Sequence, residues 1–300
     1  MQATASPPRS LLKSDERGTL IQRREVYDKL FGAAVTVAAF MGVAILFIIM
    51  GYIIVRGLPA INLEFFIGHT EPVGAEAQGG VGNAIVGTLM MLGVAVLLGI
   101  PIGIGTAIFL AEYGRGRVAD VVRFAIETLA GVPSIVMGAF IWAWLVETVM
   151  GNYSGLAGGV ALGVLMIPIV ARTAEEVLRL VPDSLREASL ALGLPYWKTV
   201  THIVVPTARA GLVTATVLAV ARAGGETAPL LMTALGNDFY NFDLREPMAA
   251  LPLTIYKYAL SPYEEWHQQA WGAALVLVVV IGGLSLLTRF VVARSSRHLT

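Results

Sequence analysis

Long apolar runs, separated by polar segments, set the pattern of this chain. Six runs are long and apolar enough to cross a bilayer, because a transmembrane helix needs roughly 20 apolar residues. They are Gly32–Val55, Val81–Ala111, Thr128–Val146, Gly155–Ala171, Ala210–Leu235 and Gln269–Thr288. Pro101 lies within the second run, where it is tolerated if neighbouring helices satisfy the freed carbonyl. Pro133 lies near the start of the third run, and Pro168 marks an expected bend in the fourth. The pattern predicts an all-α polytopic membrane protein with six transmembrane helices.

The polar segments divide the chain further. Residues 1–31 are expected to form a cytoplasmic N-terminal tail, because the apolar run after them exceeds the core of a signal peptide. Residues 32–292 form the predicted six-span domain, and 293–300 form a cytoplasmic C-terminal tail. Within the domain, Asp120–Glu127 is expected to be a short amphipathic helix that leads into the third span. Residues 172–209 form an unusually long polar loop.

The distribution of lysine and arginine predicts the orientation, because cytoplasmic loops carry an excess of these residues. If both termini lie on one side, that side holds 17 of the 21 basic residues and the opposite side holds 3. The remaining one, Arg222, falls within a span. Both termini and the loop 172–209 are therefore expected in the cytoplasm.

Composition agrees with a membrane protein and excludes several functions. The chain is 56% hydrophobic and 14% charged, whereas soluble chains average about 25% charged. Its net charge is zero, so no field favours nucleic acid, and the absence of cysteine excludes disulfides, iron–sulfur clusters and thiol catalysis. The four histidines are scattered without ligand spacing, so neither a metal nor a cofactor is expected.

No nucleotide site is visible either. The chain lacks the Gly-x-x-x-x-Gly-Lys-Ser/Thr loop that cradles nucleotide phosphates. Gly103-Ile104-Gly105 lies in an apolar run and lacks the third glycine of a dinucleotide fingerprint, so it is interpreted as helix packing. The chain is not expected to be an enzyme, and if ATP drives its function, another chain hydrolyses it.

The loop 172–209 contains signals for a short cytoplasmic helix. Ser184 and Glu187 fit a capping box, and Gly193 followed by Pro195 is a stop signal. Tyr196-Trp197 suits an interfacial belt, and Pro206 is expected to open the fifth span. A short helix that lies across the membrane face and is tied to spans at both ends is suited to transmit force.

The spacing within this loop resembles the EAA motif of binding-protein-dependent ABC importer permeases. Glu187-Ala188-Ser189 is followed by three residues, Gly193, nine residues and Ile203-x-Val205-Pro206. Ser189 replaces the usual alanine, and Val205 replaces the usual leucine. The resemblance implies that the short helix docks in a groove of a separate ATPase subunit. The alternative is that Glu187 is only a capping residue.

Two charges interrupt the fifth span. Arg222 and Glu226 are four residues apart and therefore share a helical face. Each charge at a span centre costs roughly 2.5–3.5 kcal/mol on insertion scales, so such residues normally face a bundle interior or a watered path. One interpretation is a structural pair, and the other is that Arg222 offers its donors to an oxyanion while Glu226 orients it or opposes a competing anion. Gly224-Gly225 and Pro229 weaken the helix locally.

The residues around these charges resemble the phosphate permeases of the same importers. The likeness lies in Ala221–Leu231, in Gly80–Leu89 and in Val132–Val136, and it is expected from about residue 80 to the C-terminus. It implies a MetI-like type I ABC importer permease fold in a prokaryotic inner membrane. It also implies a homologous permease partner (PstC-like), two copies of an ATPase (PstB-like) and an extracytoplasmic phosphate-binding protein. Arg222, Glu226 and Thr227 are then assigned to the anion path.

Other functions remain as alternatives. The first is a permease of this architecture for another oxyanion, such as sulfate or molybdate. The second is an ATP-independent ion-coupled carrier that uses Glu226 as a titrating group, although the dedicated cytoplasmic helix argues against it. A membrane-embedded enzyme is disfavoured because no cluster of His, Asp or Ser–His residues occurs within the spans.

Overall fold

The computed structural model describes residues 14–71 and 79–296, and most of these residues are helical. These residues contain no strand, only an isolated parallel bridge between Leu235 and Met248. The all-α prediction is confirmed. The helices are α1 Ser14–Gly57, α2 Leu63–Ile67, α3 Gly82–Ile108, α4 Arg117–Gly131, α5 Ser134–Ile141, α6 Gly155–Arg179, α7 Asp183–Ala191, α8 Tyr196–Thr199, α9 Val205–Gly224, α10 Ala228–Thr233, α11 Leu251–Ala259 and α12 Glu264–Ser296.

The chain separates into two units, Met1–Ile54 and Val55–Thr300. The described part of the first unit lies in α1, a single helix of 44 residues that contains the first predicted span. The helix begins well before Gly32, so the polar residues 14–31, which were assigned to a tail, are helical. Residues 1–13 of that predicted tail lie outside the described residues, as does the end of the C-terminal tail from 297.

Among the described residues, four helical segments are long and apolar enough to span a membrane, namely Arg23–Ala60, Gly82–Tyr113, Gly155–Arg179 and Tyr196–Gly224. A fifth exists if Arg117–Gly131 and Ser134–Met150, which meet at an angle of 104°, form one broken span. The sixth predicted span lies in α12, some of whose side chains fall outside the described set. The count of six therefore stays a prediction.

The predicted boundaries of spans three to five differ from the observed ones. The amphipathic helix runs over the whole of α4 and ends at Val132-Pro133, because proline disfavours the helical conformation of the residue before it. The fourth span continues past Ala171 to Arg179, with Pro168 inside it. Five of its last eight residues are polar or charged, so polarity alone placed the predicted end too early.

The fifth span begins at Tyr196 rather than Ala210 and ends at Gly224 rather than Leu235. Pro206 does not open it. A π-helical turn, Val200–Val204, joins α8 to α9, and Pro206 lies in the first turn of α9, where a missing N–H is tolerated. The helix ends at Gly224, and α10 begins at Ala228. The sequence alone does not predict whether the helix is interrupted here.

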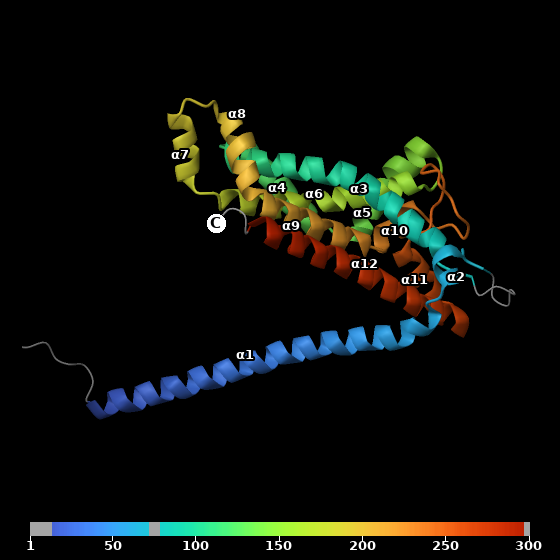
Figure 1. Cartoon of the computed structure of the whole chain (residues 1–300), viewed down its shortest axis with the longest axis horizontal. Helices are drawn as coiled ribbons and strands as arrows, with labels where there is room; N and C mark the ends of the chain where they lie inside the picture. Colours follow the sequence, from blue (N-terminus) through green and yellow to red (C-terminus); the bar gives the residue numbers. More distant parts are fainter. Residues whose placement is uncertain (1–13, 72–78, 297–300) are drawn as a thin grey trace, which may run out of the picture. The chain divides into compact units, whose positions relative to one another are not determined.

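Within residues 55–296, α3 and α6 lie side by side, with α9 against α6 and α12 against α9 (Figure 1). Small residues allow the close approach of α3 and α6. A Cβ atom on Gly103 would lie 2.7 Å from Cβ of Val170, and one on Gly99 would lie 2.9 Å from the carbonyl of Gly163. The helix-packing interpretation of Gly103 is confirmed, whereas a Cβ on Gly105 would meet nothing within 4 Å.

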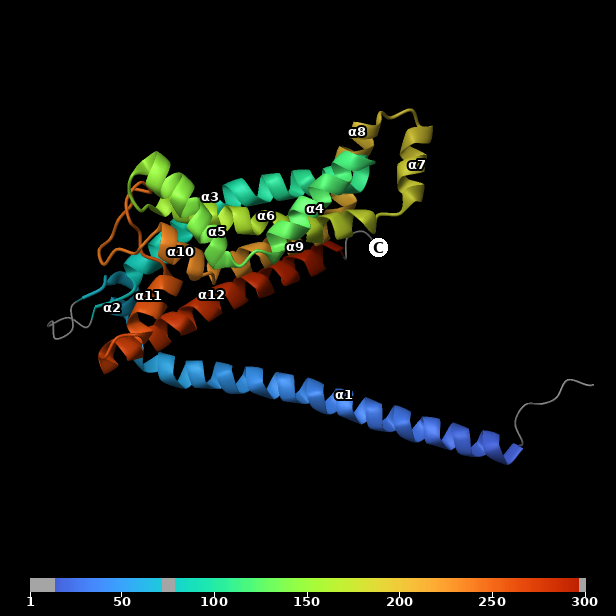
Figure 2. The same ribbon diagram turned by 180° about the vertical axis from the view of Figure 1, so that it is seen from behind.

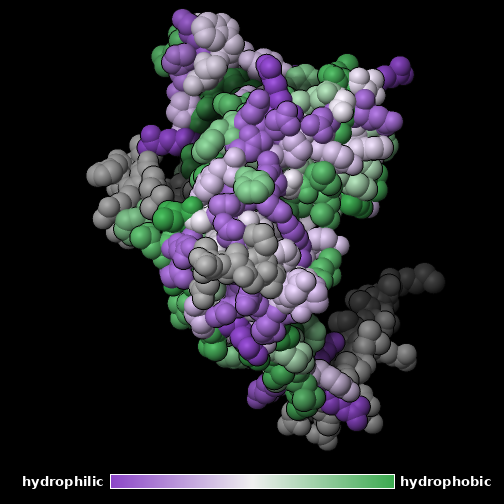
Figure 3. Space-filling view, turned by 90° about the vertical axis from the view of Figure 1, so that its right-hand side faces the viewer, coloured by the Kyte–Doolittle hydropathy of each residue, from purple (hydrophilic) through white to green (hydrophobic). Residues whose placement is uncertain are grey.

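The two ends of this bundle differ. Figure 2 shows α7 and α8 projecting at one end, and α2, α11 and the loop after α10 at the other. At that other end Asn83 of α3 donates to the carbonyl of Asn237 at 2.8 Å, and the N–H of Leu251 donates to Thr88 Oγ1 at 2.8 Å. Met248, Ala249 and Leu251 are buried, so the chain between α10 and the start of α11 packs within the bundle. Hydrophilic side chains gather across this end (Figure 3).

Candidate functional site: an ion-paired short helix and a charged cavity

The predicted short helix in the loop 172–209 exists as α7, but its N-terminus differs from the prediction. Pro182 is the N-cap residue, and its carbonyl accepts the N–H of Leu185 at 3.1 Å. No side chain caps the helix. The predicted capping box is therefore wrong, because Ser184 already lies inside the first turn. The alternative interpretation, that Glu187 is only a capping residue, is therefore wrong as well.

The C-terminus of α7 matches the prediction. Gly193 has φ of 79°, in the left-handed region that a Cβ makes costly. Its N–H donates to the carbonyl of Leu190 at 2.9 Å, and the N–H of Leu194 donates to that of Ser189 at 3.3 Å. This pair of bonds is the Schellman arrangement that closes many helices. Gly193 thus ends α7 and turns the chain toward α8.

The EAA-type residues divide between two faces of α7. Glu187 and Ala188 are exposed, whereas Ser189 is buried. The Ser189 hydroxyl lies 2.8 Å from the Thr199 hydroxyl of α8, which is also buried. The serine that replaces the usual alanine is therefore matched by a polar partner in this chain. One face of α7 is free to meet another molecule, and the other face is fixed to α8.

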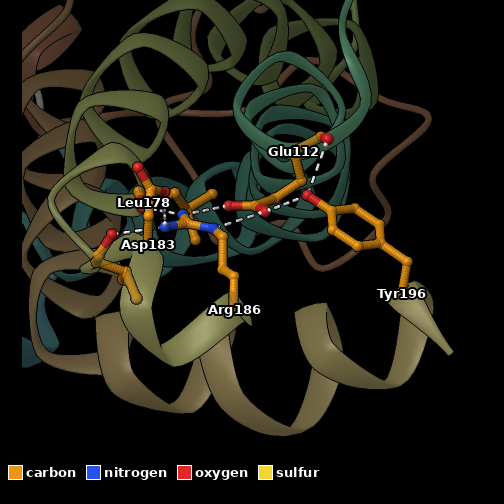
Figure 4. A network of polar contacts seen from close by, with 6 residues as sticks. Glu112, Leu178, Asp183, Arg186 and Tyr196 are labelled. Carbon is orange, nitrogen blue, oxygen red and sulfur yellow. Dashed lines mark hydrogen bonds and ion pairs between the residues drawn. The ribbon is translucent and has the colours of Figure 1, made fainter. Parts of the chain in front are cut away.

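A buried ion pair joins α7 to Glu112, which lies in the π-helical turn Phe109–Tyr113 that continues α3 (Figure 4). Arg186 donates from Nε to Glu112 Oε2 at 3.1 Å and from Nη2 to Glu112 Oε1 at 2.6 Å. The Glu112 side chain is only 1% exposed, and that of Arg186 is 14% exposed. The hydrogen bond to Glu112 raises the pKa of Arg186 above its ordinary value, and burial opposes this. The pair has the bidentate geometry in which arginine binds carboxylate most strongly.

The remaining donors of Arg186 bind the segment that joins α6 to α7. Nη2 donates to the carbonyl of Leu178 at 3.1 Å, and Nη1 donates to the carbonyl of Val181 at 2.5 Å and to Asp183 at 3.1 Å. All five N–H donors of the guanidinium therefore have partners. Carbonyls at a helix C-terminus have no partner within the helix, so Arg186 also satisfies the end of α6.

Tyr196, the first residue of α8, completes the network. Its hydroxyl donates to the Glu112 carboxylate at 2.9 Å and lies 3.2 Å from the Glu112 carbonyl. Its ring packs edge-on against Tyr113, with ring centroids 5.4 Å apart. The sequence indicated a membrane-interface role for Tyr196-Trp197, and the structure instead gives Tyr196 a buried polar partner.

A second site lies around the charges of the fifth span. Arg222 and Glu226 line a cavity of about 340 Å³ between α4, α5, α6 and α9. The break at Val132-Pro133 and the proline of α6 border the same space. The polar groups of the lining come from Ser134, Arg172, Thr173, Arg222 and Glu226.

Arg222 and Glu226 do not share a continuous helix. The N–H of Gly225 donates to the carbonyl of Arg222 at 3.1 Å, and that of Glu226 to Ala223 at 3.2 Å, so the end of α9 tightens into 3₁₀-type bonds. Arg222 Nε lies 3.9 Å from Glu226 Oε1. The Arg222 side chain is 68% exposed, and that of Glu226 is 21% exposed. Thr227 is half-buried at the N-cap of α10 and does not line the cavity.

Several residues of these sites were not singled out from the sequence. Glu112 falls just outside the second predicted span, Val81–Ala111, and only its place at the end of the apolar run Phe109-Leu110-Ala111 marks it. Arg172 was counted with the cytoplasmic loop because the fourth span was ended at Ala171. No group of three or more His, Asp or Glu residues suited to a metal ion occurs among residues 14–71 and 79–296.

Comparison with known proteins gives a consistent result. Residues 99–300 match the family described as binding-protein-dependent transport system inner membrane component. The chain is 42% identical to phosphate transport system permease protein PstA of Pasteurella multocida, over 91% of this chain and 97% of that protein. It is 41% identical to PstA of Xylella fastidiosa, over 92% and 96%, respectively. An alignment confined to residues 80–300 would cover a smaller share of this chain than these two matches do. The likeness therefore begins before residue 80, earlier than predicted.

Solved structures show the same fold. The MetNI methionine ABC transporter in an inward-facing conformation superposes with a TM-score of 0.56, at 22% identity, over 73% of this chain and 96% of that chain. A bacterial ABC transporter involved in import of the polysaccharide alginate superposes with a TM-score of 0.57, at 14% identity, over 90% and 99%. The MetI-like fold predicted from the sequence is confirmed.

Proposed function

The chain belongs to the family of binding-protein-dependent transport system inner membrane components, and from this membership we propose that it is the transmembrane permease subunit of an ATP-driven importer of inorganic phosphate. Relatives that match over nine tenths of the chain are permease proteins of phosphate transport systems. The chain is a multi-pass inner membrane protein, and in this proposal it moves the anion without catalysis of its own.

Transport then depends on other subunits. A homologous PstC-like permease completes the path, two PstB-like ATPases hydrolyse ATP, and an extracytoplasmic binding protein delivers phosphate to the outer face. The exposed face of α7, with Glu187 and Ala188, docks on the ATPase. Both termini and the loop 172–209 lie in the cytoplasm, an orientation that the distribution of basic residues supports.

The cavity beside Arg222 carries the proposal for the anion path. A guanidinium presents a planar fork of donors that fits oxyanions, and its charge is retained at every physiological pH. The cavity volume of about 340 Å³ lies within the range of small-molecule sites. Arg222 therefore binds the passing phosphate, Glu226 orients the guanidinium, and Thr227 lies at the helix break just beyond them.

The loose geometry of the Arg222–Glu226 pair favours a role in the anion path over a structural role. A pair that staples helices together is expected to be close and buried, as Glu112 and Arg186 are. Arg222 and Glu226 approach only to 3.9 Å, and most of the Arg222 side chain is open. The guanidinium therefore keeps donors available for an anion.

Uptake of labelled phosphate tests this function in proteoliposomes that hold the chain, its partner permease, the ATPase and the binding protein. We expect Arg222→Gln to lower ATP-dependent uptake by about tenfold or more, because a charge-assisted hydrogen bond contributes about 1.5–3 kcal/mol and 1.4 kcal/mol corresponds to tenfold. Arg209→Gln is the matched control, since Arg209 is an exposed arginine of α9 outside the cavity lining. Unchanged uptake in Arg222→Gln would refute the path.

The same vesicles separate the alternatives. Excess sulfate or molybdate that abolishes phosphate uptake would indicate a broader oxyanion permease. Uptake by this chain alone, indifferent to ATP, would favour the ion-coupled carrier that uses Glu226.

A further inference from the structure

The short helix α7 is connected to α6 and α8 by the chain itself, but α3 is more than 70 residues away in sequence from Arg186. We propose that Glu112 is a positioning residue that carries the displacement of α7 into α3, through its ion pair with Arg186. The proposal rests on the proposed function, in which a separate ATPase moves α7. It assigns a role to a residue at the end of a span that neither contacts the anion cavity nor belongs to the EAA-type motif.

The hydrogen bonds between Glu112 and Arg186 favour movement of the two side chains together. Every donor of Arg186 is engaged, and Glu112 accepts three hydrogen bonds, two from Arg186 and one from Tyr196. Removing one partner of a buried pair leaves an uncompensated buried charge, which is far more costly than breaking an exposed pair. A displacement of α7 that separated the two side chains would meet this cost. The end of α3 is therefore expected to follow α7.

Hydrogen bonds also connect α7 to helices other than α3. Through the carbonyl of Leu178, Arg186 holds the last turn of α6, and the hydroxyl pair Ser189–Thr199 holds α7 to α8. Three helices that cross the bundle, α3, α6 and the helix that continues from α8 into α9, thus meet at one guanidinium and one carboxylate. Of these, α6 and α9 line the anion cavity.

A matched carboxylate lies at the same end of the bundle but away from α7. Glu175 of α6 binds Arg123 of α4 at 3.0 Å and Arg179 of α6 at 2.8 Å. It is a buried glutamate paired with arginine, as Glu112 is, but its partners lie on α4 and α6. Neutralising Glu175 tests the effect of losing a buried ion pair at this end while the Glu112–Arg186 pair, which connects α7 to the end of α3, stays intact.

The decisive quantity is phosphate taken up per ATP hydrolysed in proteoliposomes that hold the complete complex. We expect Glu112→Gln to lower this ratio by about tenfold, a typical magnitude for coupling between two sites. Tyr196→Phe, which removes one of the three hydrogen bonds, is expected to lower it by about threefold. Glu175→Gln is expected to leave the ratio unchanged. Co-purification of the ATPase with each variant measures assembly separately.

Each outcome decides the question. A ratio that stays at the wild-type value in Glu112→Gln overturns the proposal, as does a loss of uptake that merely follows the loss of bound ATPase. An equal fall in this ratio in Glu175→Gln would also overturn the proposal, because the loss of any buried ion pair at this end of the bundle would then have the same effect. If the wild-type complex itself shows no ATP-dependent phosphate uptake, the proposed function fails, whatever the variants do.

Discussion

The hydroxyl pair between α7 and α8 gives the sharpest prediction about stability. Ser189 is 2% exposed and Thr199 is 0% exposed, and their oxygens lie 2.8 Å apart. Ser189→Ala restores the alanine that the EAA motif usually has, yet we expect it to destabilise this chain. It leaves the buried Thr199 hydroxyl without its partner, and an unsatisfied buried polar group costs about 1–3 kcal/mol.

The magnitude lies in the lower part of that range. The remaining hydroxyl can rotate toward the carbonyl four residues earlier in the chain, which recovers part of the loss. We therefore expect about 1–2 kcal/mol for Ser189→Ala and a similar cost for Thr199→Val. For the double variant the cost is expected to be below about 1 kcal/mol, because replacing both partners by apolar groups of similar shape is nearly neutral.

The assay is a double-mutant cycle on the thermal unfolding of the purified complex in detergent. Each single variant is expected to lower the Tm by about 2–8 °C, since 1 kcal/mol corresponds to roughly 2–4 °C in a chain of this order of size. The double variant should recover most of that shift. Additive shifts in the two single variants and the double variant would refute the reasoning, because additivity means that the two hydroxyls do not interact.

Two further predictions concern glycines. A Cβ at Gly138 of α5 would lie 2.6 Å from Cα of Pro229 in α10, so Gly138→Ala is expected to separate these helices and to lower phosphate uptake several-fold, whereas Gly93→Ala, which meets nothing within 4 Å, should leave uptake unchanged. At Gly193, where φ is 79°, alanine is expected to destabilise by about 1–2 kcal/mol, measured by thermal unfolding, and a neutral effect would show that α7 ends differently.

Features with local causes were predictable from the sequence. Hydrophobic length located helices in the first five predicted spans, because burying apolar residues in lipid needs no knowledge of distant contacts. Gly193 and Pro195 located the end of α7, because a left-handed residue and a ring that cannot continue a helix act within a single turn. The family resemblance in residues 187–206 and 221–231 identified the fold and the permease class.

Features that depend on tertiary contacts were not predictable. Glu112 directly follows the predicted second span, and only the approach of α7 to the end of α3 makes it a buried ion-pair partner. Arg172 was counted as a loop residue, but α6 continues through it and places it at the cavity. The capping box at Ser184 failed because the N-cap residue is Pro182, two residues earlier than the side-chain pattern indicated.

The length of α6 has a thermodynamic consequence. One unbroken helix of 25 residues carries Pro168 and Thr173 at the cavity and, at Leu178, the carbonyl that Arg186 holds. Binding free energies that are linked through one rigid element are reciprocal. If the position of α7 changes the affinity of the cavity for phosphate, then phosphate in the cavity changes the preferred position of α7 by the same factor. A loaded path would in this way report its occupancy back to the ATPase that drives it.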